Sequence, residues 1–263
     1  MRLLKNFCRA VFLFLACSLS SPAFSQGVAI YKKDGTMVKF AYEEIDSIVT
    51  YNYSEEPAEP SLPDTPVTPP AETQYEAVDL GLSVKWATCN VGATKPEEYG
   101  GYYAWGETEE KDDYSWSTYK WSSGSYDTIA KYCTDDIYGT ADNKTVLDPE
   151  DDVAHVKWGG GWRMPTAEEH KELHKNCSWE WTTQNGVNGY KVIGSNGNCI
   201  FLPAAGYRCD VALDNRGWDG NYWSGSLNSG HSLNAYRLKL YSDYRNQDYY
   251  YRCFGYTVRP VCE

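Results

Sequence analysis

The chain has 263 residues, and its 42% hydrophobic content is sufficient for one or two domains with a buried core. Its formal net charge is −12 at pH 7, which makes nucleic acid and anionic membrane surfaces unfavourable partners. Aromatic residues make up 15% of the chain, and the 23 Tyr and 10 Trp greatly outnumber the 7 Phe. This excess of amphipathic aromatic side chains favours half-exposed surfaces over a dry core.

Residues 1–25 have the three-part layout of a secretory signal peptide. A basic start precedes the apolar run 10–17, which is too short to cross a bilayer as a helix, and Ala23 and Ser25 form a small-residue cleavage site. Cleavage before Cys17 is the alternative, and it would produce a lipid-anchored protein. We therefore expect an exported protein that is secreted, periplasmic or on the outer cell surface, without a transmembrane segment in the mature chain.

Two short segments separate the predicted signal peptide from the main domain. Residues 26–53 predict a small β-hairpin unit, because apolar and polar residues alternate on both sides of the Asp34-Gly35 turn signal. A helical turn and a further strand are expected over 42–51. Residues 54–74 hold six of the twelve prolines and contain neither Lys nor Arg, which predicts an extended, semi-rigid linker.

Residues 75–263 predict an α+β domain in which two short helices accompany many antiparallel strands. The first helix is expected after Asp148 as the N-cap, with Pro149 at its first position. The second is expected after Pro165, where the spacing of Thr166 and Glu169 predicts a capping box. Strands are expected over 78–92, 190–194, 199–206, 221–227, 235–241 and 255–262.

The domain contains six ordered sequence blocks: VDLGLSVKWATCNVGA (78–93), YYAWGE (102–107), GGGWRMPTAEE (159–169), FLPAAGYR (201–208), YWSGSL (222–227) and GYTVRPVCE (255–263). Together these blocks resemble the Fibrobacter succinogenes major paralogous domain family, which is common in secreted Bacteroidetes proteins. The resemblance implies a C-type-lectin-like fold, a distant relative of the formylglycine-generating enzyme group, in which the two ends of the domain meet in one sheet. It implies no defined biochemical function.

Seven cysteines follow the signal region, and an odd number leaves at least one of them without a partner in the same chain. Export permits disulfides, but the sequence does not define their connectivity. The chain contains no Cys-x-x-Cys pair, so neither a zinc knuckle nor a thioredoxin-type centre is indicated. The seven are Cys89, Cys133, Cys177, Cys199, Cys209, Cys253 and Cys262.

One helix carries three potential zinc ligands, because His170, His174 and Cys177 follow each other at helical spacing. Leu173 shares their face, however, so a pair of buried and hydrogen-bonded histidines is the favoured interpretation.

The acidic stretch 142–152 has many oxygen ligands of the kind that calcium prefers. Asp148 and Glu150 are better explained as acids at the start of a helix. The calcium and sugar signatures of true C-type lectins are absent from the sequence. We expect no metal ion and no cofactor.

A catalytic role has little support in the sequence. Cys199 and Cys209 flank residues 200–208, and formylglycine-generating enzymes use a cysteine pair, but nothing around these two cysteines predicts a lowered thiol pKa. The chain lacks a nucleophile elbow, a phosphate loop and a zinc-protease motif, and His155 and His231 have no evident partner. We expect no enzyme activity, and an enzyme related to formylglycine generation is an alternative.

The C-terminal region has the composition of a contact surface. Residues 218–253 are rich in Tyr, Ser, Asn, Gly, Asp, Arg and Trp, which are typical of antibody loops and binding hot spots. The prediction is a recognition or adhesion module that binds a glycan or protein through one aromatic and charged surface. The predicted contact residues are Trp218, Tyr222, Trp223, Tyr236, Arg237, Tyr241, Asp243, Tyr244, Arg245, Tyr249, Tyr251 and Arg252.

Two further alternatives remain open. The same composition is typical of proteins whose C-terminal codons are diversified by a retroelement, which would make this a variable display protein of the same fold. A structural surface protein, whose aromatic residues only pack against their neighbours, is the other. In each case we expect residues 241–253 to form an exposed turn with its flanks, and 255–261 to form a constant closing strand.

Overall fold

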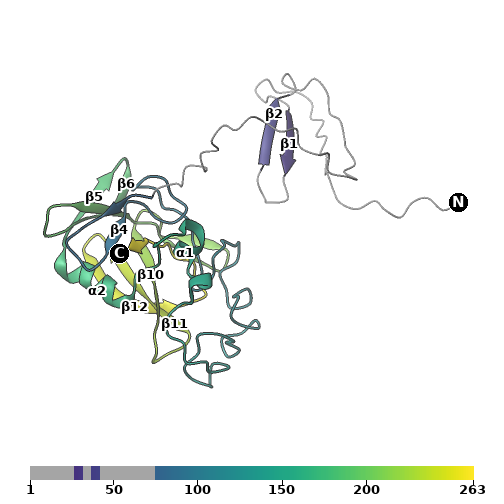
Figure 1. Ribbon diagram of the computed structural model, residues 1–263. Helices are drawn as coiled ribbons and strands as arrows, with labels where there is room; N and C mark the ends of the chain where they lie inside the picture. The colour runs from purple at the N-terminus through teal and green to yellow at the C-terminus, as the bar shows by residue number, and fades with distance from the viewer. Residues whose placement is uncertain (1–26, 32–36, 42–74) are drawn as a thin grey trace, which may run out of the picture. The chain divides into compact units, whose positions relative to one another are not determined.

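The computed structural model describes residues 27–31, 37–41 and 75–263 (Figure 1). The chain divides into two units, Met1–Val67 and Thr68–Glu263. The predicted signal peptide and Pro-rich linker lie outside the described residues, as does the helical turn expected over 42–51. Across the described ranges, no helix is long and apolar enough to cross a membrane.

The first unit contains the predicted hairpin. Strand β1 (Gly27–Tyr31) pairs antiparallel with β2 (Met37–Ala41). The register places Gly27 opposite Ala41 and Tyr31 opposite Met37, as expected for two alternating segments that flank a turn signal.

The second unit contains two short α-helices and several small antiparallel sheets, which agrees with the α+β prediction. Its longest strands form the sheet β10–β11–β12: β10 (Asp219–Leu227), β11 (Asn234–Tyr241) and β12 (Tyr244–Tyr251). The exposed turn expected within 241–253 lies at residues 242–243, and the flank that follows it is strand β12. Only two residues turn, and β12 then pairs with β11 along its whole length because its tyrosines suit a pleated strand.

A small sheet joins the two ends of residues 75–263. Its order is β13–β4–β3, from β3 (Ala77–Val78), β4 (Lys85–Ala87) and β13 (Val261–Cys262). The single strand expected over 78–92 is wrong, because the chain bends between β3 and β4, where Gly81 has a φ of +73°. The closing strand is also interrupted, and only its last two residues join this sheet.

The other strands form two local sheets. A three-stranded meander contains β5 (Ser178–Gln184), β6 (Val187–Ile193) and β7 (Cys199–Pro203). A short hairpin contains β8 (Tyr207–Cys209) and β9 (Ala212–Asp214).

The helices start at local capping signals. Helix α2 (Ala167–Asn176) has the predicted capping box, in which Thr166 Oγ1 accepts from the Glu169 N–H and the Glu169 carboxylate accepts from the Thr166 N–H. Helix α1 (Val153–Trp158) is capped by Asp152 instead of Asp148, because Pro149 starts a separate 3-10 turn, η2 (Pro149–Asp151).

Helix α2 lies beside β12 in Figure 1 and contacts all three strands of the β10–β11–β12 sheet. Leu173 of this helix packs in one core cluster with Leu238 of β11 and Trp86 of β4. A second cluster surrounds Trp105 and Trp223. The sheet therefore has a buried core on each side, and this arrangement decides which of its side chains reach the surface.

Candidate functional site

Alternate residues of the β10–β11–β12 sheet point to opposite faces. The side facing α2, called here the helix face, is identified by the contact of Leu238 with Leu173 and by the hydrogen bond from Gln247 Nε2 to Ala167 O. Strand register assigns to it Tyr222, Tyr236, Leu238, Leu240, Arg245, Gln247, Tyr249 and Tyr251. The opposite side, called the polar face, has Asp219, Asn221, Trp223, Ala235, Arg237, Lys239, Tyr241, Tyr244, Asn246, Asp248 and Tyr250.

A continuous hydrogen-bond network crosses the polar face. Arg237 is buried, and its Nε donates to Asp248 Oδ1 at 2.7 Å. Its terminal nitrogen Nη1 donates to Asn221 Oδ1 at 2.8 Å and to the Tyr256 hydroxyl at 2.6 Å. Asn221 Nδ2 in turn donates to Asp219 Oδ1 at 3.1 Å. These bonds fix four polar side chains on three strands before any ligand arrives.

Charge on this network is set by burial and pairing. Burial raises the pKa of Asp219 above its ordinary value, partly offset by hydrogen bonds from Asn215 and Asn221. Burial opposes the charge on Arg237, but neighbouring Tyr256 and Asp248 outweigh that effect and raise the Arg237 pKa. At neutral pH Arg237 is therefore a cation held by a carboxylate, a geometry that fixes both groups.

Aromatic rings border the network. The Arg237 guanidinium lies 4.6 Å from the ring centroid of Tyr250, which is 40% exposed. At the other end of the face, the rings of Tyr241 and Tyr244 stack with their centroids 4.6 Å apart. Half-buried Lys239 lies between these two borders, with its Nζ 5.9 Å from the Tyr241 ring. The face therefore combines fixed polar groups with stacking surfaces at both ends.

The twelve predicted contact residues differ in how far their side chains are exposed to solvent. Trp218 is 78% exposed, and Tyr249 and Tyr251 are also well exposed. Of the other predicted residues, five are exposed or half-buried: Tyr236, Tyr241, Asp243, Tyr244 and Arg245. Four of the predicted surface positions are buried and must be corrected: Tyr222, Trp223, Arg237 and Arg252.

The four corrections have separate physical reasons. Tyr222 and Trp223 alternate into the two cores, because β10 is covered on both of its faces. Arg237 is the centre of the polar network. Arg252 is fully buried, and it donates to three backbone carbonyl oxygens, those of Lys131, Tyr132 and Ser232, and to the Tyr119 hydroxyl. It therefore holds loops together rather than contacting a ligand.

The remaining predicted residues do not form one surface. Tyr241 and Tyr244 lie on the polar face, whereas Tyr236, Tyr249 and Arg245 lie on the helix face. Besides Ala235, the sequence interpretation missed six polar or aromatic residues of the polar face: Asp219, Asn221, Lys239, Asn246, Asp248 and Tyr250. Those that lie on β11 and β12 could have been identified from the sequence. Every second residue after Arg237 lies on the same face, and the two-residue turn at 242–243 carries this alternation from Tyr241 to Tyr244.

Burial works against a reactive thiolate at Cys209 and Cys253. All seven cysteines of the 75–263 range are thiols, and Cys199 and Cys209 lie in separate sheets. Burial raises the pKa of Cys209 and raises that of Cys253 to about 12, whereas a nucleophilic thiolate needs a lowered pKa.

The acidic cluster near α1 is already paired with a lysine side chain. Asp148, Glu150 and Asp151 are the group of potential metal ligands found within the described residues. Lys131 Nζ lies 2.6 Å from both Asp148 and Asp151, which places an ammonium where a calcium ion would need to bind. These residues therefore do not fit a calcium site.

The predicted histidine pair is only partly correct. His170 is fully buried and stacks on Trp86 with ring centroids 5.9 Å apart, but neither of its ring nitrogens has a hydrogen-bond partner among the described residues. Burial lowers its pKa to about 3, so it is neutral at physiological pH. His174 is half-buried near Trp179. The expectation of a hydrogen-bonded core pair is therefore wrong for His170.

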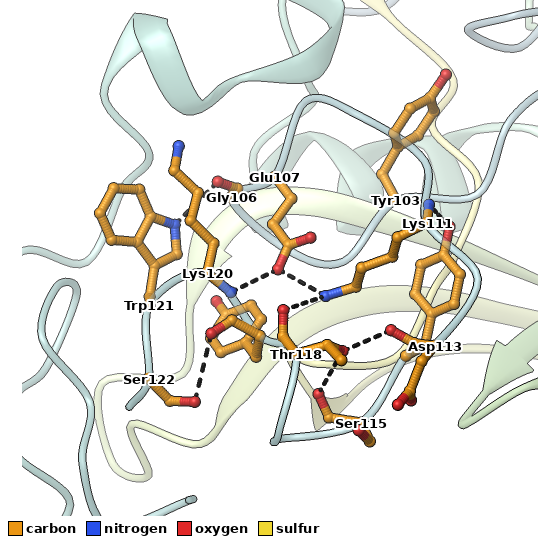
Figure 2. Close-up of polar contacts among 12 residues, drawn as sticks. Tyr103, Gly106, Glu107, Lys111, Asp113, Ser115, Thr118, Lys120, Trp121 and Ser122 are labelled. Carbon is orange, nitrogen blue, oxygen red and sulfur yellow. Dashed lines mark hydrogen bonds and ion pairs between the residues drawn. The ribbon is translucent and has the colours of Figure 1, made fainter. Parts of the chain in front are cut away.

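A second polar cluster occupies the loops between 103 and 122 (Figure 2). The buried Glu107 carboxylate accepts from Lys111 Nζ and from the Lys120 backbone N–H, both at 2.8 Å. The Thr118 hydroxyl donates to the Asp113 carbonyl at 2.6 Å. Each of these bonds joins two parts of the same loop region, so the cluster organises the loops.

Comparison with protein-family models, curated proteins and solved structures finds no match to this chain.

Proposed function

We propose that this chain is an exported, non-catalytic recognition protein that binds an uncharged glycan on the polar face of the β10–β11–β12 sheet. The observation that carries the proposal is the preorganised network beneath a border of tyrosines. Arg237, Asn221 and Asp248 are held by one another, while Tyr244 and Tyr250 are available for stacking. Fixed polar groups and rigid rings recognise a sugar at low conformational cost.

The charge of the face favours an uncharged ligand. The carboxylates of Asp219 and Asp248 are matched by the cations of Arg237 and Lys239. Sugar hydroxyls donate and accept hydrogen bonds, so they complement the accessible groups of this face, which are the Asp248 carboxylate, the Asn246 amide and the Lys239 ammonium. The ring faces of a sugar are apolar enough to stack on tyrosine.

We further propose a C-type-lectin-like fold and membership of the major paralogous domain family. Two features support this assignment. The ends of the 75–263 region meet in the sheet β13–β4–β3, as that fold requires. In addition, two of the six sequence blocks, 78–93 and 255–263, supply the paired residues of β4 and β13. Export by the signal peptide completes the proposal, because a glycan-binding module of this kind acts at or beyond the cell surface.

A glycan array probed with the purified protein tests the function, and calorimetry on any positive glycan tests the site. Tyr244→Ala should weaken binding about tenfold, the equivalent of ~1.4 kcal/mol of lost stacking and contact area. Tyr249→Ala removes the same ring from the helix face and should leave the affinity unchanged.

Three outcomes would contradict the proposal. Binding restricted to sulfated or uronic acid glycans would refute the charge argument. Loss of affinity in Tyr249→Ala but not in Tyr244→Ala would place the site on the helix face. A protein ligand without any glycan ligand would refute the ligand class.

A further inference from the structure

Strand β12 is the outer strand of its sheet, and its hydrogen-bonding pattern identifies the groups on its free edge. Tyr241 and Tyr244 close a two-residue hairpin, so Tyr244 and every second residue after it bond to β11. The bond from the Arg252 N–H to Leu233 O, at 3.0 Å, continues the same ladder. The backbone groups of the odd-numbered residues, from Arg245 to Tyr251, therefore point away from the sheet.

Most of this edge is free. The N–H groups of Gln247, Tyr249 and Tyr251 have no hydrogen-bond partner within residues 75–263. At the hairpin end, the His174 ring contacts the Arg245 backbone, so that end is partly occupied. At the other end, the Tyr251 C=O accepts from the Phe254 N–H at 3.1 Å, so the open groups are those of Gln247 and Tyr249 and the N–H of Tyr251. These groups are complementary to another strand.

The side chains along the edge also present contact area. Tyr249, Tyr250 and Tyr251 are 51%, 40% and 42% exposed, and successive rings lie on opposite faces of the sheet. A strand added at this edge would therefore meet tyrosine rings on both of its sides. Such pairing combines main-chain hydrogen bonds with side-chain contacts on alternate faces.

Self-pairing about Gln247 gives a complementary register. With Gln247 opposite its own copy, Arg245 faces Tyr249 on the helix face, which suits a cation–π contact. On the polar face Asp248 then faces Asn246, so no two like charges are opposed. The outward-pointing residues of one copy meet the outward-pointing residues of the other, as antiparallel pairing requires.

We propose that two copies of this chain associate by antiparallel pairing of their β12 edges, centred on Gln247, to form a continuous six-stranded sheet. The inference is tested separately from glycan binding, because backbone pairing of β12 is measured without a glycan, although the same register places Tyr244 opposite Tyr250 of the other copy on the polar face. The net charge of −12 per chain opposes association, so the dimer should weaken at low salt, where charge repulsion is less screened.

Sedimentation equilibrium of the full chain at 0.15 M salt tests the proposal. We expect a dimer that dissociates on dilution. Tyr249→Pro removes an outward N–H without touching the ladder to β11, a position where an edge strand tolerates proline. Tyr249→Thr removes the same ring and keeps the N–H. Tyr249→Pro should weaken the dimer at least tenfold relative to Tyr249→Thr, while both variants keep the parent circular dichroism spectrum.

Amide hydrogen exchange supplies a second, residue-level readout. The amides of Gln247 and Tyr249 should be protected at high protein concentration and become fast on dilution, whereas those of Asn246 and Asp248 should remain protected throughout. A protein that stays monomeric at millimolar concentration would overturn the proposal. So would a dimer that is equally strong in Tyr249→Pro and Tyr249→Thr, or protection of these amides only when a different protein is added.

Discussion

The two faces of the β10–β11–β12 sheet bury polar groups in opposite ways. On the polar face, buried Arg237 has four hydrogen bonds, to Asp248, Asn221 and Tyr256. On the helix face, buried His170 of α2 lies in the apolar core, and both of its ring nitrogens lack a partner within the described part of the chain. An unpaired buried charge costs more than an unpaired neutral group, but hydrogen-bond partners offset that cost. We therefore expect the paired Arg237 to stabilise its region and the neutral, unpaired His170 to destabilise its own.

The largest expected effect is the loss of Arg237. Arg237→Met leaves the Asn221 amide oxygen and the Tyr256 hydroxyl buried without this donor, so the free energy of unfolding should fall by about 3 kcal/mol. Asp248 is 34% exposed, and water replaces part of its lost pairing. Urea denaturation measures the change.

Lys239→Met is the matched control, since Lys239 lies on the same face and is only half-buried. It should change the free energy of unfolding by less than about 0.5 kcal/mol. Equal effects from the two substitutions would refute the structural role of the network.

The second expected effect is an increase in the free energy of unfolding, and its size depends on pH. His170→Leu removes two unpaired nitrogens from the core and should raise the free energy of unfolding by about 1–2 kcal/mol at pH 7. Because the folded-state pKa of His170 is lowered to about 3, its unfolded state binds the proton first as the pH falls below about 6.5.

The parent protein should therefore lose stability through this group at about 1.4 kcal/mol per pH unit between pH 6 and pH 3.5. His170→Leu should lack that contribution, so the stability difference between the two proteins should grow as the pH falls. Urea denaturation at pH 7, 5.5 and 4.5 measures it. A difference that is constant over this range would mean that His170 has a partner in solution.

The smallest expected effects are at the aromatic border. Tyr244→Ala breaks the stacked pair with Tyr241 and should lower the free energy of unfolding by about 0.5–1 kcal/mol. Tyr249→Ala breaks only an edge contact with Tyr236, whose ring centroid is 6.1 Å away, and should cost less. Thermal denaturation of the two variants measures these losses of stability. A larger loss in Tyr249→Ala than in Tyr244→Ala would show that tyrosine packing is tighter on the helix face.

Local features of the fold were predictable from sequence. The capping box of α2 needs only Thr166 and Glu169, three positions apart, and it forms as expected. Strand β11 follows from alternation within a single segment, in which Tyr236, Leu238 and Leu240 alternate with Arg237 and Lys239. By contrast, β12 lacks an apolar stripe, because both of its faces carry polar and aromatic residues, and its strand structure depends on pairing with β11.

The candidate site was only half predictable, because residue type does not determine burial. Arginine and tyrosine occur both in binding surfaces and in interiors, and partners distant in the sequence decide between these places. Arg252 donates a hydrogen bond to the carbonyl oxygen of Tyr132, which is 120 positions away in the sequence. Nothing in the segment around Arg252 encodes that contact, whereas the Arg237–Asp248 pair lies within one hairpin and was accessible through its register.

The sheet β13–β4–β3 also has a consequence for the two ends of residues 75–263. Its first and last strands, Ala77–Val78 and Val261–Cys262, both pair with β4 from its two sides, so the two ends of residues 75–263 lie in one small sheet. A pull between these two ends would load only the few backbone bonds that hold β3 and β13 to β4. Joining the two ends and opening the chain elsewhere should therefore preserve the core, because adjacent surface termini favour circular permutation.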